Sequence, residues 1–223
     1  MRQIFIFAML LVSSLASYAN DWIDTEHFRA ANDSVRQLDA SRRRIVLMGN
    51  SISHNWAAFH KDFLDAHGIV GRGISGQTTS HFLARFRQDV IDLKPEMVII
   101  FGGTNDIAEN HGEYNEDLTM NNIISMVELA KANGIRPVLC AVLPVTSYWW
   151  RPEAVGVQDK IDSLNRRIEA YAREHGIPYA DFFTPLAMPD RTINPAYADD
   201  GVHPNPDGYV VMEKVLLDVL GEK

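Results

Sequence analysis

The sequence contains a single cysteine, fewer basic than acidic side chains, and no long apolar run beyond its first residues. Cys140 lies inside the apolar stretch 138–143, which excludes an intrachain disulfide and an N-terminal lipid attachment site. The formal net charge is −8 at pH 7, so nucleic acid and anionic lipid surfaces are poor partners. We therefore predict no nucleic-acid partner.

The first 19 residues have the pattern of a secretory signal peptide. Arg2 gives a positive start, apolar residues run from Ile4 to Leu15, and Ser17-Tyr18-Ala19 has the small-x-small form of a cleavage site. The apolar stretch is too short to span a bilayer comfortably, which disfavours the alternative of a retained anchor. We expect an exported protein, periplasmic or extracellular, that starts near Asn20 and has no stable membrane insertion.

Helical and strand patterns alternate along residues 20–223. Short apolar runs predict strands at Arg44–Met48, Ile69–Arg72, Met97–Phe101, Arg136–Leu143 and Pro178–Asp181. Apolar residues at helical spacing predict helices at Phe28–Leu38, Ala57–Ala66, Thr79–Leu93, Leu118–Ala132 and Gln158–Glu174, and a last helix capped by Asn205. Strands that are apolar throughout belong to a parallel sheet covered on both faces. The sequence thus predicts one α/β domain, a flavodoxin-like three-layer α/β/α sandwich with a five-stranded parallel sheet.

Three of the predicted helices end alike, in His67-Gly68-Ile69, Asn133-Gly134-Ile135 and His175-Gly176-Ile177. Glycine adopts the left-handed conformation that closes a helix before a strand. This repeated ending supports the alternation of helix and strand.

Polar loops follow the first three predicted strands, at residues 49–51, 73–77 and 102–106. Parallel strands bring their carboxyl ends to one edge of the sheet, where open α/β folds bind ligands. Far downstream, Asp200 precedes His203 by three residues, immediately before the last helix. These four segments are candidates for one shared site.

Ser51 is the candidate nucleophile, because it follows a buried strand on a tight Gly-Asn turn. A serine hydroxyl is a weak nucleophile unless a neutral imidazole accepts its proton, and the imidazole needs a carboxylate to orient it. The loop with Asp200 and His203 carries both groups. A glycine N–H and a fixed amide suit the oxyanion that forms during attack.

The four segments, in this order and spacing, resemble the SGNH/GDSL hydrolase family of serine esterases, and the resemblance extends from Ile45 to the last helix. It implies the SGNH hydrolase fold, with Ser51 as nucleophile and Asp200 and His203 completing the triad. It also implies an oxyanion hole formed by the Ser51 N–H, the Gly73 N–H and the Asn105 amide. Within the family the chain looks most like compact bacterial members that remove short acyl groups, including acetyl groups on carbohydrates.

Four further residues are predicted to contact substrate: Asn50, Asp106, Trp149 and Trp150. Asn50 replaces the aspartate of the family's Gly-Asp-Ser pattern, but that residue transfers no proton in a triad mechanism. The two tryptophans follow the fourth strand, where they form a wall of the site or cover the core.

No cofactor or metal is predicted. Gly71–Gly76 fits the G-x-G-x-x-G pattern, but it follows the second strand and lacks the acid that a dinucleotide site needs at the end of the next strand. Asp199 and Asp200 lack the converging oxygen ligands of a calcium site.

The predicted function is a secreted serine esterase for short-chain carboxylic esters, with a small-molecule or glycan ester as its substrate. A lysophospholipase or arylesterase, and a catalytically weak glycan-binding domain, are the alternatives. The sequence leaves the oligomeric state open.

Overall fold

A computed structural model describes residues 22–221, so the predicted signal peptide lies outside the described residues. Its centre is a parallel sheet with strand order β2-β1-β3-β4-β5. The strands are β1 (Ile45–Gly49), β2 (Ile69–Gly73), β3 (Met97–Phe101), β4 (Arg136–Cys140) and β5 (Tyr179–Ala180). The predicted sheet and its five strands are confirmed, and the order is that of flavodoxin-like folds.

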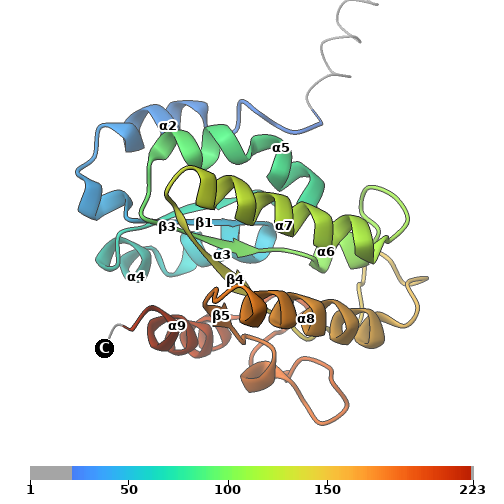
Figure 1. Cartoon of the computed structure of the whole chain (residues 1–223). Helices are drawn as coiled ribbons and strands as arrows, with labels where there is room; N and C mark the ends of the chain where they lie inside the picture. Colours follow the sequence, from blue (N-terminus) through green and yellow to red (C-terminus); the bar gives the residue numbers. More distant parts are fainter. Residues whose placement is uncertain (1–21, 222–223) are drawn as a thin grey trace, which may run out of the picture.

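Helices cover both faces of this sheet (Figure 1). The α-helices are α2 (Arg29–Arg36), α3 (Ser51–Phe59), α4 (Lys61–Ala66), α5 (Thr79–Asp89), α6 (Thr104–Ile107), α7 (Glu116–Ala132), α8 (Val157–Glu174) and α9 (Pro206–Leu220). Short 3₁₀ helices are η1 (Ala40–Arg43), η2 (Ile91–Leu93) and η3 (Thr184–Leu186). Helices α5, α7 and α8 pack on one face, and α3, α4 and α9 pack on the other.

The core follows the alternation of side chains along each strand. In β1, Val46 and Met48 belong to the apolar cluster under α5, α7 and α8, whereas Ile45 and Leu47 belong to the opposite cluster. All four side chains are fully buried or nearly so. Burial on both faces explains why β1 is apolar at every position.

Two predicted helices are divided. The segment 57–66 was expected to be one helix, but α3 begins at Ser51 and ends at Phe59, and α4 starts after a break at His60. The early start arises because the Asn50 side chain accepts a hydrogen bond from the Ile52 N–H and caps a polar first turn. Similarly, α5 ends at Asp89 because the backbone of Val90 leaves the helical region.

Strand β4 ends at Cys140, three residues before the predicted end at Leu143. The apolar run continues, but β5 pairs with β4 only as far as Cys140 and Ala180. Beyond that point the Asn165 side chain replaces a strand: its Oδ1 accepts from the Val142 N–H at 2.7 Å and its Nδ2 donates to the Val142 carbonyl at 2.9 Å. A side chain from α8 therefore satisfies backbone groups that the sequence assigned to the sheet.

Within the described residues, each helix lacks either the length or the apolar character that crossing a bilayer requires. The predicted helix endings are confirmed, since Gly68, Gly134 and Gly176 all have positive φ, at 63°, 72° and 63°. Asn205 also caps α9 as predicted, accepting from the Gly208 N–H at 3.0 Å.

The helix-closing glycines provide a stability prediction. Gly134→Ala should lower the free energy of unfolding by about 1–2 kcal/mol. The added Cβ is strained at a left-handed φ, although it meets no other atom within 4 Å. Gly68→Ala should cost more, because its Cβ would also collide with the Ser41 carbonyl. Urea denaturation of both variants checks this order. Equal losses in the free energy of unfolding would show that the structure relaxes to avoid the Ser41 carbonyl without further destabilisation.

Candidate active site

Ser51 is the first residue of α3, and Asn50 alone separates it from the end of β1. The turn between them is tight, because a Cβ on Gly49 would lie 2.7 Å from the Ser53 Cβ of α3. The Ser51 side chain is half-buried and lines a cavity. The strand and the helix thus fix the hydroxyl at the carboxyl edge of the sheet.

His203 lies against this serine although 152 residues separate them in the sequence. The Ser51 Oγ and the His203 Nε2 are 2.9 Å apart, and the His203 Nδ1 and the Asp200 Oδ2 are 2.6 Å apart. The second carboxylate oxygen of Asp200 accepts from the backbone N–H groups of His203 and Val202, at 2.7 and 2.9 Å. The three side chains therefore form a continuous hydrogen-bonded chain.

This chain has the geometry for nucleophilic catalysis. Nδ1–H donates to Asp200, which leaves Nε2 free to accept the serine proton. Partial burial raises the pKa of Asp200, but the hydrogen bonds from His203 and Val202 outweigh it and hold the pKa below the usual aspartate value. Asp200 is thus an anion at neutral pH and can stabilise an imidazolium.

Two contacts hold the Asp200 loop in place. The Thr146 N–H, from the segment after β4, donates to the Gly201 carbonyl at 2.9 Å. The Tyr209 hydroxyl of α9 donates to the Ile52 carbonyl in the first turn of α3 at 2.8 Å. The second bond ties the helix after His203 to the helix that carries Ser51.

The predicted oxyanion donors lie at the ends of the neighbouring strands. Asn105, in α6 after β3, lines the cavity, and its Nδ2 donates one hydrogen to the Gln77 carbonyl at 2.9 Å. A side-chain amide has a second hydrogen for a ligand. Gly73 ends β2 beside the start of α3, where a Cβ would lie 2.6 Å from the Asn50 carbonyl oxygen. Only glycine permits this approach between β2 and α3, but Gly73 itself does not line the cavity, whereas Gly76 of the following loop does.

The cavity around Ser51 has a volume of about 390 Å³. Its lining residues are Ser51, Asn55, Ser75, Gly76, Asn105, Asn110, Trp149, Trp150 and His203. It lies between the loops that follow β1 and β3, where the strand order reverses, the usual ligand position in such sheets.

Both predicted tryptophans line this cavity. The Trp150 ring lies 6.2 Å from the His203 ring, centroid to centroid, and its Nε1 donates to the Asn110 Oδ1 at 2.8 Å. Trp149 packs edge-on against Trp150, and 67% of its surface is exposed. Trp150 is thus fixed beside the base, while Trp149 presents an indole to solvent at the rim.

Two residues that were predicted to contact substrate do not line the cavity. Asn50 is 2% exposed and uses its side chain to cap α3, so it does not line the cavity. Asp106 likewise faces α5 and α7: its carboxylate accepts from the Thr79 N–H and hydroxyl and from the Thr119 hydroxyl. Burial raises the pKa of Asp106, although the hydrogen bonds from Thr79 act in the opposite direction. Its role is to cap α5, a favourable position for an acidic side chain.

The sequence reading missed four lining residues: Asn55, Ser75, Gly76 and Asn110. Asn55 lies one turn after Ser51 on the same helix, a spacing that became visible only once α3 was known to begin at Ser51. Asn110 donates to the Gly76 carbonyl at 3.2 Å and accepts from Trp150, so it joins the loops after β2, β3 and β4.

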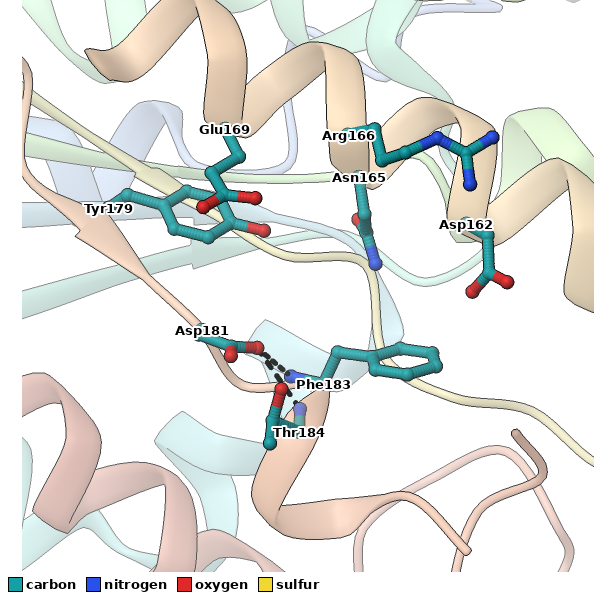
Figure 2. A pocket seen from close by; sticks show the side chains of 8 residues that line it. All are labelled: Asp162, Asn165, Arg166, Glu169, Tyr179, Asp181, Phe183 and Thr184. Carbon is teal, nitrogen blue, oxygen red and sulfur yellow. Dashed lines mark hydrogen bonds between the residues drawn. The ribbon is translucent and has the colours of Figure 1, made fainter. Parts of the chain in front are cut away.

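A second cavity, of about 260 Å³, lies between α8 and the end of β5 (Figure 2). The residues around it are Asp162, Asn165, Arg166, Glu169, Tyr179, Asp181, Phe183 and Thr184. Asp181 accepts from the backbone N–H groups of Phe183 and Thr184, which closes the turn after β5. This second cavity lacks a paired nucleophile and base, so it is not the candidate active site.

Among residues 22–221, no group of three or more histidine, cysteine, aspartate or glutamate side chains could hold a metal ion.

Comparisons with known proteins agree with this geometry. Residues 17–211 match the GDSL-like Lipase/Acylhydrolase family. A GDSL-like lipase from Bacteroides thetaiotaomicron has a similar crystal structure, with a TM-score of 0.86 and 45% sequence identity over 89% of this chain and 98% of that chain.

Two more distant relatives share parts of the sequence. An acetylxylan esterase of Geobacillus stearothermophilus is 25% identical over 165 residues, which cover 69% of this chain and 72% of the esterase. An uncharacterised lipoprotein of Bacillus subtilis is 35% identical over 80 residues, 34% of this chain and only 33% of the lipoprotein. From the extent of the family match, supported by the structural similarity, the chain belongs to the GDSL-like lipase/acylhydrolase family of ester hydrolases.

Proposed function

We propose that this protein is an exported serine esterase that removes short acyl groups, in particular O-acetyl groups on carbohydrates, through an acyl-Ser51 intermediate. The observation that carries the proposal is the chain of hydrogen bonds from Ser51 through His203 to Asp200 at the edge of an open cavity.

The reaction follows from the positions of these groups. His203 Nε2 accepts the proton of Ser51 as its oxygen attacks the ester carbonyl, and Asp200 stabilises the imidazolium. The Ser51 N–H and the Asn105 amide, two groups of residues that line the cavity, stabilise the oxyanion of the tetrahedral intermediate. The alcohol leaves with the proton from His203. Water then repeats the sequence on the acyl-enzyme and releases the acid.

The composition of the cavity favours a short acyl group and a polar alcohol. Apart from the two tryptophans, polar side chains and a glycine line it, so a long acyl chain would gain little apolar contact. Each CH₂ left in water forgoes about 0.8 kcal/mol of burial. The exposed Trp149 indole offers a flat apolar surface to a sugar ring. The acetylxylan esterase relative is consistent with a carbohydrate ester.

Export rests on the sequence pattern of residues 1–19, with the lipoprotein relative as secondary support. A lysophospholipase or arylesterase activity is the alternative within the family. A catalytically weak glycan-binding protein is the alternative outside enzymes, since Asn50 stands where the family has aspartate.

Ser51→Ala should abolish esterase activity and labelling by a fluorophosphonate, because both need the activated hydroxyl. Ser53→Ala is the matched control: this serine lies two residues further along α3, is buried, and has no hydrogen-bond partner for its hydroxyl. It should keep both properties. Turnover by Ser51→Ala at the rate of the control would refute the acyl-Ser51 mechanism.

Asn105→Ala should lower kcat by about 10²–10³ with a smaller change in KM, the usual result of deleting one oxyanion donor. Asn50→Asp should alter both parameters far less, because a carboxylate can still accept from the Ile52 N–H. Steady-state kinetics on nitrophenyl acetate measures both. A gain of orders of magnitude in Asn50→Asp would instead identify the natural asparagine as the cause of an attenuated site.

Trp149→Ala should lower kcat/KM on acetylated xylo-oligosaccharides more than on nitrophenyl acetate, because only the sugar can extend to the rim. The Val155→Ala variant, which removes another exposed apolar side chain from the same loop region, serves as control and should affect neither substrate. Equal losses on both substrates in Trp149→Ala, or a wild-type optimum at long acyl chains, would favour the lipase-like alternative.

A further inference from the structure

Three asparagine side chains line the cavity around Ser51, and they differ in the bonds that they form. Asn105 uses one hydrogen of its amide, and Asn110 uses both ends of its amide, for hydrogen bonds to neighbouring loops. The side-chain amide of Asn55, by contrast, has no hydrogen-bond partner in the part of the chain that the structure describes. Its donors and its acceptor are therefore open to a ligand.

Helix α3 places Asn55 close to the nucleophile. Ser51 and Asn55 are four residues apart on this helix, so they share one face, with Cβ atoms about 5–6 Å apart. Side chains on a helix tilt toward its amino end, so Asn55 leans toward the turn that carries Ser51. Two other residues of the helix, Ile52 and Trp56, are buried in the core and anchor it. A rigid element thus presents a half-buried amide to the cavity.

The partial burial of Asn55 determines what a ligand has to offer. Solvent reaches the amide, because the residue is only half-buried. A ligand that fills the cavity removes this solvent, and an amide left without a partner weakens binding by the cost of its desolvation. A ligand with a hydrogen-bonding group at this position avoids that cost. The amide therefore selects for a polar group next to the ester bond.

The alcohol part of the ester is the part that can supply this group. An acetyl group has one polar atom outside the ester bond itself, the carbonyl oxygen, and the proposed mechanism directs that oxygen to the oxyanion donors. The acetyl methyl group offers an amide nothing. A sugar has free hydroxyls, each both a donor and an acceptor, and these match an amide with two N–H donors and a carbonyl acceptor.

The amide and the indole at the rim distinguish substrates in different ways. The exposed Trp149 indole contacts the apolar face of a ring whatever substituents the ring carries. The Asn55 amide distinguishes a hydroxyl from an acetylated oxygen, because only the hydroxyl has a hydrogen to donate. A site built to bind a substrate hydroxyl discriminates against analogues that lack it, since its own polar group is then left unpaired.

We infer that Asn55 is a specificity-determining residue that binds a free hydroxyl of the alcohol part, next to the ester. This assignment narrows the substrate class to partially acetylated saccharides, which keep a free hydroxyl near an acetyl group. The inference rests on the proposed esterase function, because that function directs the ester carbonyl to the oxyanion donors.

Asn55→Leu and Asn55→Ala test the inference by steady-state kinetics on three acetyl esters. The esters are a methyl xyloside with one acetyl group, the fully acetylated methyl xyloside, and nitrophenyl acetate. Leucine keeps roughly the volume of asparagine but has no hydrogen-bonding group. Both variants should lose about tenfold in kcat/KM on the singly acetylated xyloside, the effect of one lost hydrogen bond. On the other two esters, which have no free hydroxyl, they should stay within about twofold of the wild type.

His54→Ala is the matched control. His54 adjoins Asn55 on α3, but its side chain is exposed and does not line the cavity. This variant should keep the wild-type kcat/KM on all three esters. The Asn55 variants should also unfold at the wild-type temperature, because the amide forms no bond within the described protein whose loss would destabilise the fold.

Wild-type kcat/KM of both Asn55 variants on the singly acetylated xyloside would overturn the inference. An equal loss on all three esters would overturn it as well, because the effect would then lie at the nucleophile. The same holds for a wild-type protein that acts on nitrophenyl acetate but on neither xyloside. A wild-type protein that neither hydrolyses nitrophenyl acetate nor reacts with a fluorophosphonate would refute the proposed function itself, a result distinct from these.

Discussion

The parallel pairing of β1 between β2 and β3 is the constraint on which the rest of the site depends. The register places Gly49 opposite both Gly73 and Phe101, so the three strands end at one level. The loops that carry Ser51, the Gly73 peptide and Asn105 therefore begin side by side. Glycines at positions 49 and 73 are part of this constraint, because a Cβ at either would press on the neighbouring backbone. Backbone packing thus fixes the positions at which the segments carrying Ser51 and Asn105 begin.

His203 and Asp200 reach the same edge of the sheet by a different route. Asp200 and His203 come from the loop before α9, outside the sheet, and two hydrogen bonds to the rest of the chain hold that loop. The carboxylate accepts from the backbone of its own loop as well as from the imidazole, so it cannot rotate away from His203. A short local turn thereby supplies the orientation that an imidazole base needs.

The tryptophan wall of the cavity has a separate structural origin. One part of the cavity wall is formed by Trp149, Trp150 and Asn110, from the segments after β4 and β3. These segments are not part of the sheet, and their positions depend on a few bonds such as that from Trp150 to Asn110. This wall can therefore vary without moving Ser51, in line with the general separation of fold from function.

The sequence by itself determined the parallel α/β fold, since apolar strands alternated with amphipathic helices that end in glycine. It also identified Ser51, Asp200 and His203 as candidates, because the loops that carry them are local and distinctive. It did not determine the start of α3 at Ser51, which a polar first turn conceals. Only the tertiary structure decided which way the polar side chains near these loops face.

Asn50 and Asp106 show the difference most clearly. Both adjoin residues of the site in sequence, yet one caps α3 and the other caps α5, because an unpaired helix N–H attracts the nearest acceptor. Arg85 shows the converse, since nothing in its helical sequence context relates it to the ends of β1 and β2. Its guanidinium meets the Gly49 and Arg72 carbonyls only because α5 packs across the ends of β1 and β2. Contacts between residues distant in sequence depend on packing, and no local pattern encodes them.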